Sequence, residues 1–354
     1  MLFQTPPLLP REAEIIAEIE AIRRQLDAPL PKLREWPGLP WREIHDRVVG
    51  AGSEETPAAE SYRSALGFVL QLADAPDFRY DEGIFRALHF LMLRHHPAKN
   101  PGHWRRGVML VARQEHFAGY VDYRAPDFRR VPGLMAELFA ELNAPGDAPA
   151  YVRAAMAHLN LATIHPFLDG SGRMARALHT LVLVREGIFM PAFASIDEYV
   201  SMNHAAYVKA LQEAHGGAWQ PEREARPWVR FCLTAHLRQA TRLRKHSRDY
   251  DRLWEELERE AARRALPERV VSALATAAMG GQLTTDEYQS FAELSADAAS
   301  EDLKALVDAG FLAYADQPPG FTSSAALQAI AARCCEPDEP EPDPFAAGAS
   351  APAS

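Results

Sequence analysis

The sequence predicts a mostly helical (all-α) protein with one small β-hairpin and a small winged helix-turn-helix domain near its C-terminal end. Three observations predict this fold class. Apolar residues recur at helical spacing in several long stretches, as at Val152, Ala155 and Leu159. Two β-prone runs flank a polar tip within residues 101–123. Three helical patterns and then a short pair of β-prone runs occupy residues 266–322.

Residues 1–60 are predicted to form an N-terminal helix and a connector. Glu12–Asp27 has the apolar spacing of an amphipathic helix, and a Pro- and Trp-rich stretch follows at Pro29–Pro40. Gly50–Pro57 indicates a short loop before the next helical pattern, Ser61–Leu72. We therefore expect the main domain to begin near residue 61.

The main domain is predicted to span residues 61–250, with the hairpin near 107–123. Helical spacing predicts further helices at Val131–Leu142, Tyr151–Ile164, Arg173–Val184, Glu198–Leu211 and Trp228–Leu243. Residues 251–265 mix opposite charges at i,i+4 spacing, which predicts an exposed helical bridge to the smaller domain.

The stretch HPFLDGSGRMAR, residues 165–176, carries the chemistry of the main domain. Pro166 disfavours helical geometry at His165, so a loop is expected to follow the preceding helix. Gly170 and Gly172 let the main chain approach an anion closely. The next helix begins with free N–H groups that also favour negative charge.

The charged residues of this stretch predict the same kind of ligand. Arg173 and Arg176 lie three apart in the first turn of a helix, where cations are unfavourable unless an anion binds. Asp169 is a hard oxygen ligand suited to Mg²⁺, and His165 can accept a proton near neutral pH. Each residue taken alone is more often structural, and Phe167 alone indicates a core side chain. Together they predict a phosphate site with a metal and a general base.

This stretch resembles the signature of the Fic family, HxFx[DE]GNGRxxR. The matching residues are His165, Phe167, Asp169, Gly170, Gly172, Arg173 and Arg176, and Ser171 stands where the family has Asn. The resemblance implies a protein adenylyltransferase that moves AMP from ATP to a Ser, Thr or Tyr hydroxyl of a target protein and releases pyrophosphate. It implies that His165 is the catalytic base and that Asp169 holds Mg²⁺. The ATP phosphates would lie on Gly170, Ser171, Gly172, Arg173 and Arg176.

Other segments extend the resemblance from about Leu66 to Leu312. The hairpin resembles the family's flap, where an unknown target protein would dock as an added strand; an ordinary surface hairpin is the alternative. Asn203 and Tyr207 match a segment that lines the adenine pocket. A solvated Asn and a core Tyr are the alternative for this pair.

Two departures from the family concern activity and control. Ser171 offers a hydroxyl instead of an amide, and a lost phosphate contact of about 1 kcal/mol or more would reduce activity. Many relatives carry an inhibitory segment, [ST]xxxE[GN], whose Glu pairs with the second arginine of the signature. Thr56 and Glu60 approximate this pattern without its Gly or Asn. We interpret the inhibitory segment as absent or truncated.

Residues 266–330 resemble a winged helix-turn-helix, which is common behind Fic domains in bacteria. The third helical pattern carries more acids than bases, namely Asp297, Glu301, Asp302 and Asp308 against Lys304. Because such a face repels phosphate, packing, homo-oligomer formation or target recognition is favoured over DNA binding. Residues 331–354 are acidic and rich in Pro and Ala, and are predicted to be disordered.

The composition predicts a soluble, cytoplasmic enzyme that binds no membrane. The net charge of −10 argues against a nucleic-acid or anionic membrane surface. Cys232, Cys334 and Cys335 leave no disulfide framework. The sequence shows neither a charged-then-apolar leader nor an apolar run of transmembrane length.

Two alternatives to an adenylyltransferase stay open from the sequence. The first is a nucleotide-binding regulatory or DNA-binding protein with a weakened Fic site. The second is a Fic enzyme that removes AMP or transfers another phosphate-linked group. Gly172 argues against the phosphotransferase branch, Doc, where a lysine stands at that position.

Overall fold

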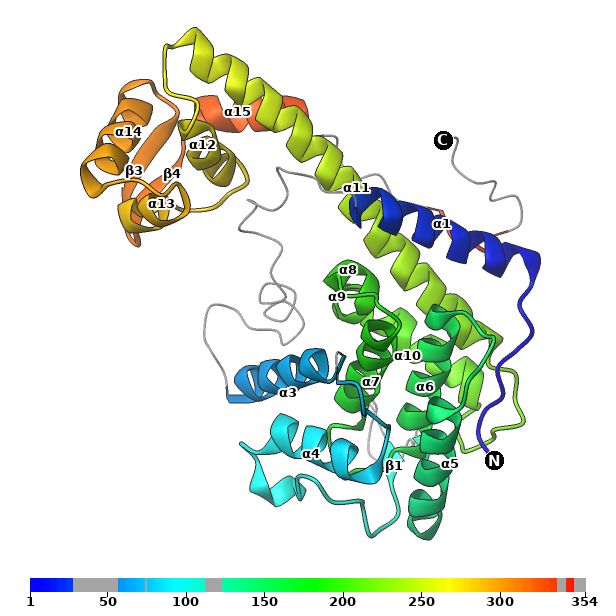
Figure 1. Ribbon diagram of the computed structural model, residues 1–354. Helices are drawn as coiled ribbons and strands as arrows, with labels where there is room; N and C mark the ends of the chain where they lie inside the picture. Colours follow the sequence, from blue (N-terminus) through cyan, green and yellow to red (C-terminus); the bar gives the residue numbers. More distant parts are fainter. Residues whose placement is uncertain (28–56, 74, 112–122, 336–341, 347–354) are drawn as a thin grey trace. The chain divides into compact units, whose positions relative to one another are not determined.

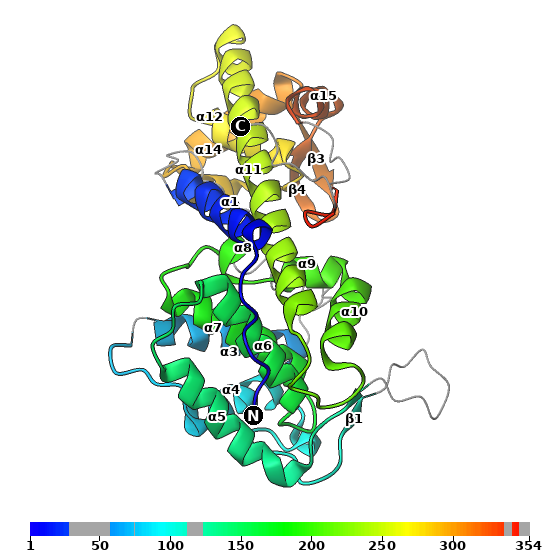
Figure 2. The same ribbon diagram turned by 90° about the vertical axis from the view of Figure 1, so that its right-hand side faces the viewer.

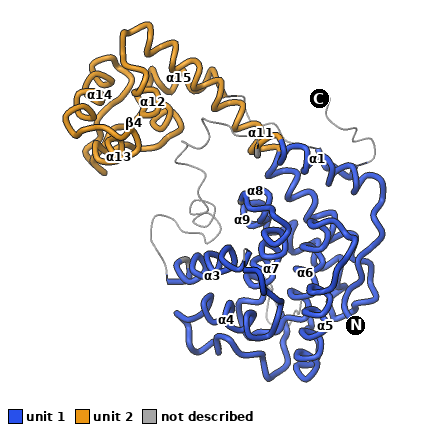
Figure 3. Tube along the Cα trace, viewed as in Figure 1, with its two compact units in different colours: residues 1–24, 39–240, 342–354 blue, residues 25–38, 241–341 orange. Residues whose placement is uncertain are grey.

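The structure is a computed structural model, and it describes residues 1–27, 57–73, 75–111, 123–335 and 342–346 (Figure 1). The chain divides into two compact units (Figure 3). Unit 1 comprises residues 1–24, 39–240 and 342–354, and unit 2 comprises residues 25–38 and 241–341. Helices dominate both units, so the prediction of a mostly helical fold is confirmed.

Unit 1 consists of helices with one small hairpin. Its elements are α1 (Pro10–Asp27), α3 (Pro57–Ala73), α4 (Glu82–Leu93), η2 (Pro97–Lys99), β1 (Leu110–Val111), β2 (Tyr123–Arg124), η3 (Phe128–Arg130), α5 (Val131–Asn143), α6 (Ala150–Ile164), α7 (Ser171–Arg185), α8 (Pro191–Ala194), α9 (Asp197–Met202), α10 (His204–His215) and the first part of α11 (Arg226–Arg263). The last residues of α1 fall within unit 2.

Helices α6 and α7 form the centre of unit 1 (Figures 1 and 2). They pack against each other, with α3 on α7 and α5 on α6. Nearly the whole circumference of both helices is buried, and residues such as Leu159 and Leu181 are fully buried. Both helices therefore belong to the core of the unit. The loop between α6 and α7 is therefore held by the most buried part of the unit.

The predicted hairpin is formed at its base. Strand β1 pairs antiparallel with β2, so that Leu110 lies opposite Arg124 and Val111 opposite Tyr123. Tyr123 is buried and its hydroxyl donates to the carbonyl oxygen of Thr163, which ties the hairpin to the end of α6. Residues 112–122, which include the tip of the predicted flap, lie outside the described residues.

Helix α11 differs from the sequence prediction. The two predicted elements, 228–243 and the bridge 251–265, are parts of one continuous helix, Arg226–Arg263. The bridge is not exposed on all sides, because Leu253, Leu257 and Ala261 are buried in the core of unit 2. These residues repeat every four positions between the charged pairs, and they form an apolar stripe on one face. The charges on the other faces concealed this stripe in the sequence analysis.

The described part of unit 2 includes three short helices, a hairpin and a final helix. After the second part of α11, these are α12 (Val270–Ala278), α13 (Thr285–Phe291), α14 (Ala296–Asp308), β3 (Leu312–Asp316), β4 (Pro319–Ser323) and α15 (Ala325–Cys334). Strands β3 and β4 pair antiparallel, with Tyr314 opposite Phe321. The order of helices and strands agrees with the predicted elements. The predicted disordered tail was expected to begin at residue 331. Residues 331–334 instead form the last turn of α15, which ends at Cys334.

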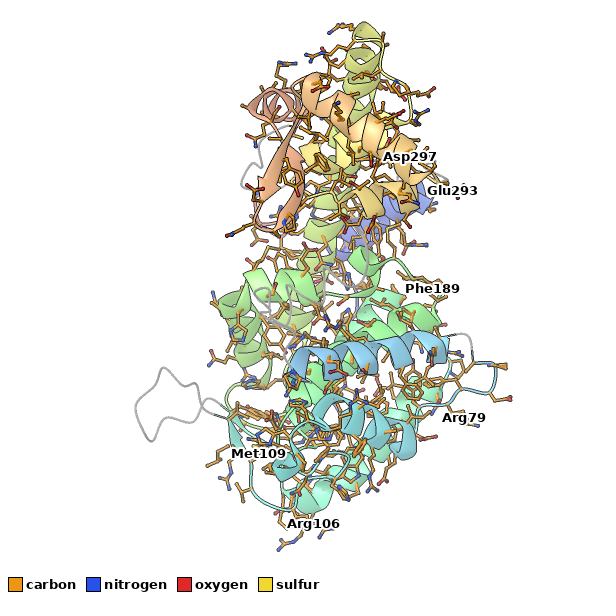
Figure 4. The ribbon with its side chains drawn as sticks, turned by 90° about the vertical axis from the view of Figure 1, so that its left-hand side faces the viewer. Arg79, Arg106, Met109, Phe189, Glu293 and Asp297 are labelled. Carbon is orange, nitrogen blue, oxygen red and sulfur yellow. The ribbon has the colours of Figure 1, made fainter. Side chains whose placement is uncertain are left out.

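The acidic residues of α14 do not all face solvent. Asp297 and Glu301 are exposed, and Figure 4 labels Asp297 on unit 2. Asp302, in contrast, is buried, and its carboxylate accepts hydrogen bonds from Arg269 and from the Tyr288 hydroxyl. Asp302 therefore stabilises the packing of α12, α13 and α14 and adds no charge to the outer face.

The described residues contain no helix that is both long enough and apolar enough to cross a membrane. The three cysteines are free thiols, and Cys232 is buried in unit 1. In this described part of the chain, no group of three or more His, Cys, Asp or Glu side chains is arranged to hold a metal ion.

Candidate active site

The loop between α6 and α7 has an unusual backbone at both ends. His165 follows α6 with φ of 49°, and Gly170 precedes α7 with φ of 76°. Left-handed backbone geometry is rare for residues other than glycine. Here it ends α6 at His165 and sets the direction of α7 at Gly170. The first N–H groups of α7 therefore open onto a short, tightly held loop, which suits an anion.

His89 of α4 holds this loop in place through contacts with Phe167 and Asp169. Its ring stacks on Phe167 at a centroid distance of 3.6 Å, and Trp104 packs on the same Phe167 ring. The Gly102 N–H donates to His89 Nδ1 at 2.8 Å, so the ring proton lies on Nε2, which donates to the Asp169 carbonyl oxygen at 2.9 Å. Burial lowers the pKa of His89 to about 4, which keeps the ring neutral. The sequence analysis did not identify this residue.

Arg105 braces the other end of the loop. Its Nε donates to the His165 carbonyl oxygen at 2.7 Å, and its terminal nitrogens donate to the carbonyl oxygens of Gly107 and Pro126 at 2.9 and 2.6 Å. The backbone N–H of Arg105 donates to the Pro166 carbonyl oxygen at 2.9 Å. A buried guanidinium with several carbonyl acceptors fixes the position of His165 against the segment that leads to the hairpin.

His165 itself is a neutral imidazole at physiological pH. Burial lowers its pKa to about 4, and the nearby Arg105 guanidinium lowers it further, while the Ala162 carbonyl and the Asp169 carboxylate oppose the shift. Because the neutral ring carries a free lone pair, His165 can accept a proton from a ligand. The structure thus places the predicted base beside the predicted metal ligand.

Asp169 is an ionised and accessible carboxylate. Its side chain is 38% exposed and lies 3.6 Å from both Lys99 Nζ and Arg173 Nη2, on different oxygens. Burial would raise the pKa of Asp169, but the Gly170 N–H at 2.6 Å and the two cations outweigh burial and lower it. An accessible, ionised oxygen donor fits Mg²⁺, which binds through one or two carboxylates and substrate phosphates. Lys99 is a further cation that the sequence analysis missed.

The two arginines of the signature take different partners. Arg173 points to Asp169, whereas Arg176 forms a buried ion pair with Asp197 at the start of α9. Asp197 also accepts hydrogen bonds from the hydroxyls of Tyr62 and Ser195, at 3.1 and 3.0 Å. Burial alone would lower the pKa of Arg176, but the Asp197 carboxylate outweighs it and raises the pKa. The guanidinium groups therefore do not act as the equivalent pair that their spacing predicted.

Ser171 points into the loop. It is 1% exposed, and the Phe167 N–H donates to its hydroxyl at 3.3 Å. Its hydroxyl therefore holds the loop together, and its backbone N–H remains the group that can reach a phosphate. Gly172 has free space around its Cα, and the Arg176 Nη1 atom lies on the same side of the helix.

The two predicted adenine-pocket residues lie at the start of α10. Asn203 is partly exposed, and its amide donates to the Tyr199 carbonyl oxygen at 3.0 Å. Tyr207 is 6% exposed, its hydroxyl lies 3.1 Å from His158 Nε2, and its ring packs against Trp228. Asn203 is therefore accessible to a ligand, while Tyr207 is part of the core.

Of the two candidate inhibitory residues, the structure describes Glu60, which pairs with Arg94 and not with the second arginine of the signature. Thr56 lies outside the described residues. Glu60 is largely exposed, and its carboxylate lies 3.5 Å from Arg94. The acid that pairs with Arg176 is Asp197, which comes from a segment after the signature and gave no signal in the sequence.

We expect Gly170→Ala to destabilise unit 1 by about 1–2 kcal/mol, because a Cβ is strained at positive φ. The added atom would also lie 3.1 Å from Leu93 Cδ1. Gly172→Ala is the matched control, since its Cβ would meet only Arg176 Nη1 at 3.9 Å within a helix. Urea unfolding of both variants measures the difference. Equal stability of the two variants would contradict the assigned geometry of the loop.

The fold and the site define a class of protein. A buried helical pair presents a neutral imidazole, an ionised carboxylate and a guanidinium beside a helix N-terminus, an arrangement that suits a phosphate-bearing ligand. The sequence profile of the Fic/DOC family matches residues 79–183. The chain therefore contains a Fic/DOC family domain.

Curated relatives match a short part of the chain. The chain is 38% identical over 79 residues to the protein adenylyltransferase fic-1 of Caenorhabditis elegans, which is 22% of this chain and 13% of that protein. It is 32% identical over 88 residues to a probable protein adenylyltransferase of Aquifex aeolicus, which is 25% of each chain. The chain thus spans a quarter or less of the length of these two relatives.

Solved structures resemble more of the chain. A Fic family protein from Desulfovibrio desulfuricans covers 91% of this chain and 98% of its own, with a TM-score of 0.54 and 21% identity. A Fic domain containing signaling protein from Bacteroides thetaiotaomicron covers 67% of this chain and 97% of its own, with a TM-score of 0.51 and 18% identity. At these identities the likeness concerns the fold.

Proposed function

We propose that the chain is a protein adenylyltransferase that moves AMP from ATP to a Ser, Thr or Tyr hydroxyl of a target protein. One observation carries the proposal: neutral His165 and ionised Asp169 lie on the same loop, at the N-terminus of α7. This combination offers a proton acceptor, a metal ligand and an anion site within one ligand's reach. The names of the partial relatives support the same activity.

In the proposed reaction, the hydroxyl oxygen of the target attacks the α-phosphorus of ATP. The new oxygen–phosphorus bond forms while the bond from the α-phosphorus to the bridging oxygen breaks, and pyrophosphate leaves. His165 takes the hydroxyl proton on its ring. Asp169 would hold Mg²⁺, which neutralises phosphate charge when bound. The N–H groups of Ser171 and Gly172 and the Arg173 guanidinium bind the phosphates.

The test is incubation of the full chain with magnesium and ATP radiolabelled at the α-phosphate, with and without a cell lysate as the source of targets. We expect label on a protein band and an AMP-sized increase in intact mass of the modified protein. ATP labelled at the γ-phosphate, incubated with the chain and magnesium without lysate, is the control and should leave no label. The absence of α-label from every protein, with nucleotide still bound, would favour a regulatory nucleotide-binding protein instead.

The pH dependence of transfer should reflect the buried state of His165. Because the pKa of His165 is about 4, the neutral form predominates both at about pH 5.5 and at about pH 7.5. We therefore expect similar single-turnover rates at these two values. If His165 had the ordinary histidine pKa, the rate would be about tenfold lower at pH 5.5 than at pH 7.5, because the protonated ring cannot act as a base. Circular dichroism at both values checks that the fold is retained.

For unit 2 we propose a winged helix-turn-helix that makes protein contacts. Three helices followed by the β3–β4 hairpin support this assignment. Exposed Asp297 and Glu301 on α14 repel phosphate, so contacts with a target or with a second copy of the chain are favoured over DNA. Specific retention of duplex DNA at physiological salt would contradict this role.

A further inference from the structure

A short segment near the C-terminal end packs on unit 1. It comprises Pro342–Ala346, which the sequence analysis assigned to a disordered tail. Arg11 of α1 donates from Nε to the Pro344 carbonyl oxygen at 2.9 Å, and Arg238 of α11 donates to the Pro342 carbonyl oxygen. The Arg230 guanidinium lies over the Phe345 ring, 4.9 Å from its centre. Pro344 is buried. Three arginines from two helices thus contact one short segment.

The segment lies at the wall of a groove in unit 1. The groove encloses a cavity of about 480 Å³ between α10 and the start of α11, and Asp343 and Phe345 form part of its lining. Its lining combines apolar side chains, such as Phe231, with charged side chains of both signs, such as Lys209 and Glu213. The segment forms one wall of this cavity, and the Arg230 guanidinium over the Phe345 ring is a cation–π contact.

The Arg230 side chain that contacts Phe345 is held in place by a buried carboxylate. Glu12 of α1 is 1% exposed and pairs with Arg226 and Arg230 at 2.7 and 2.9 Å. Burial would raise the pKa of Glu12, but the Leu9 N–H and the two arginines lower it. Because Glu12 fixes the Arg230 side chain, its guanidinium face is presented to the Phe345 ring without further ordering. A pre-ordered contact loses little entropy when its ligand binds.

The segment is also chemically suited to the arginines. Residues 336–346 read EPDEPEPDPFA, with five acids, four prolines and one aromatic ring. Proline limits the conformations of a free chain, so less conformational entropy is lost when the segment is held through its carbonyl oxygens. Within the segment, the Phe345 N–H donates to the Asp343 carboxylate at 2.9 Å and the Ala346 N–H to the Asp343 carbonyl oxygen, which forms a turn.

We propose that the surface formed by Arg11, Arg230 and Arg238 is a docking site for an acidic proline–aromatic peptide, and that the chain's own Pro342–Ala346 is its occupant. We call this surface of three arginines the tail groove. The occupant and the three arginines all belong to unit 1. The proposal is independent of any catalytic activity.

The first test is cleavage of the folded, full chain by chymotrypsin after Phe345, followed as the mass loss of residues 346–354. A docked Phe345 is protected, since cleavage requires the open form. We expect cleavage at least about tenfold slower than in a free peptide of residues 336–354. The double variant Arg11→Gln with Arg238→Gln should approach the peptide rate, while Arg130→Gln, an exposed arginine outside the groove, should not. Equal rates in the unaltered chain and the peptide, or no effect of the double variant, would overturn the proposal.

The second test measures docking of the peptide supplied separately. A fluorescent peptide of residues 336–346 should bind the full-length Phe345→Ala chain at least about tenfold more tightly than the unaltered chain, because the native segment competes at millimolar effective concentration. The same peptide with alanine in place of its phenylalanine should bind neither. Equal binding to both chains, or no binding to Phe345→Ala at millimolar peptide, would contradict a site for this segment.

Discussion

Replacing His165 by alanine is expected to lower the rate of AMP transfer by about 10²–10⁴-fold, the usual contribution of a general base. The neutral His165 ring is the proton acceptor of the proposed reaction, and its position is held by Arg105 through the backbone. ATP binding should change little, because the phosphates contact the backbone of α7 and the arginines. Single-turnover transfer, with nucleotide binding measured separately, distinguishes the two effects.

The controls for His165 must account for its backbone. His165 has φ of 49°, where alanine is strained and asparagine is tolerated. His165→Asn should therefore retain the stability of the fold and still lose transfer. His103→Ala removes an exposed imidazole from a neighbouring segment and should leave transfer intact. Full transfer by His165→Asn would exclude His165 as the base.

The sequence predicted those parts of the site that depend on neighbouring residues. Pro166 and Gly170 determine the loop, and helical spacing determines α6 and α7 on either side. Each of these effects acts within a few residues, so a local pattern is enough to reveal it. Helix α7 begins at Ser171, however, two residues before the predicted start at Arg173, so Ser171 and Gly172 lie in its first turn and Arg176 lies beyond that turn.

The parts that the sequence did not reveal depend on contacts across the fold. His89 and Arg105 lie 60 or more residues before the loop that they brace, and neither belongs to a pattern of its own. Asp197 follows Arg176 by 21 residues and looks like an ordinary acid in the first turn of a helix. The tail segment 342–346 has a disordered composition, yet arginines of α1 and α11 bind it. Long-range pairs of this kind appear only when helices pack.

Replacing Asp197 by asparagine is expected to lower the free energy of unfolding by about 3–5 kcal/mol, because removal of one partner leaves a buried cation unpaired. Asp197 is 2% exposed, and it is the anion that raises the pKa of Arg176. An asparagine side chain has the shape of the Asp197 side chain and keeps some of its hydrogen bonds to Tyr62 and Ser195. The decrease in the free energy of unfolding therefore results mainly from the loss of the charge. Urea unfolding monitored by circular dichroism gives the difference.

Glu186→Gln is the matched control for this loss of charge. It makes the same acid-to-amide change in an ion pair with Arg153, but the Glu186 side chain is 38% exposed. Exposed pairs contribute about 0–1 kcal/mol, so this variant should stay close to the unaltered chain. A loss in Asp197→Asn no larger than that in Glu186→Gln would show that Arg176 does not depend on its buried partner.

Asp197→Asn also tests whether Arg176 reaches a nucleotide. Asp197 engages the Nε side of the guanidinium, and Nη1 lies toward Gly172 at the start of α7. A phosphate bound at this helix N-terminus would supply the negative charge that Asp197→Asn has lost. ATP with magnesium should therefore raise the unfolding temperature of Asp197→Asn by more than that of the unaltered chain, because a ligand that binds the folded state more tightly stabilises it more. Equal increases in the two proteins would mean that Arg176 serves only the packing of α3, α7 and α9, and that Arg173 alone provides the guanidinium for the phosphates.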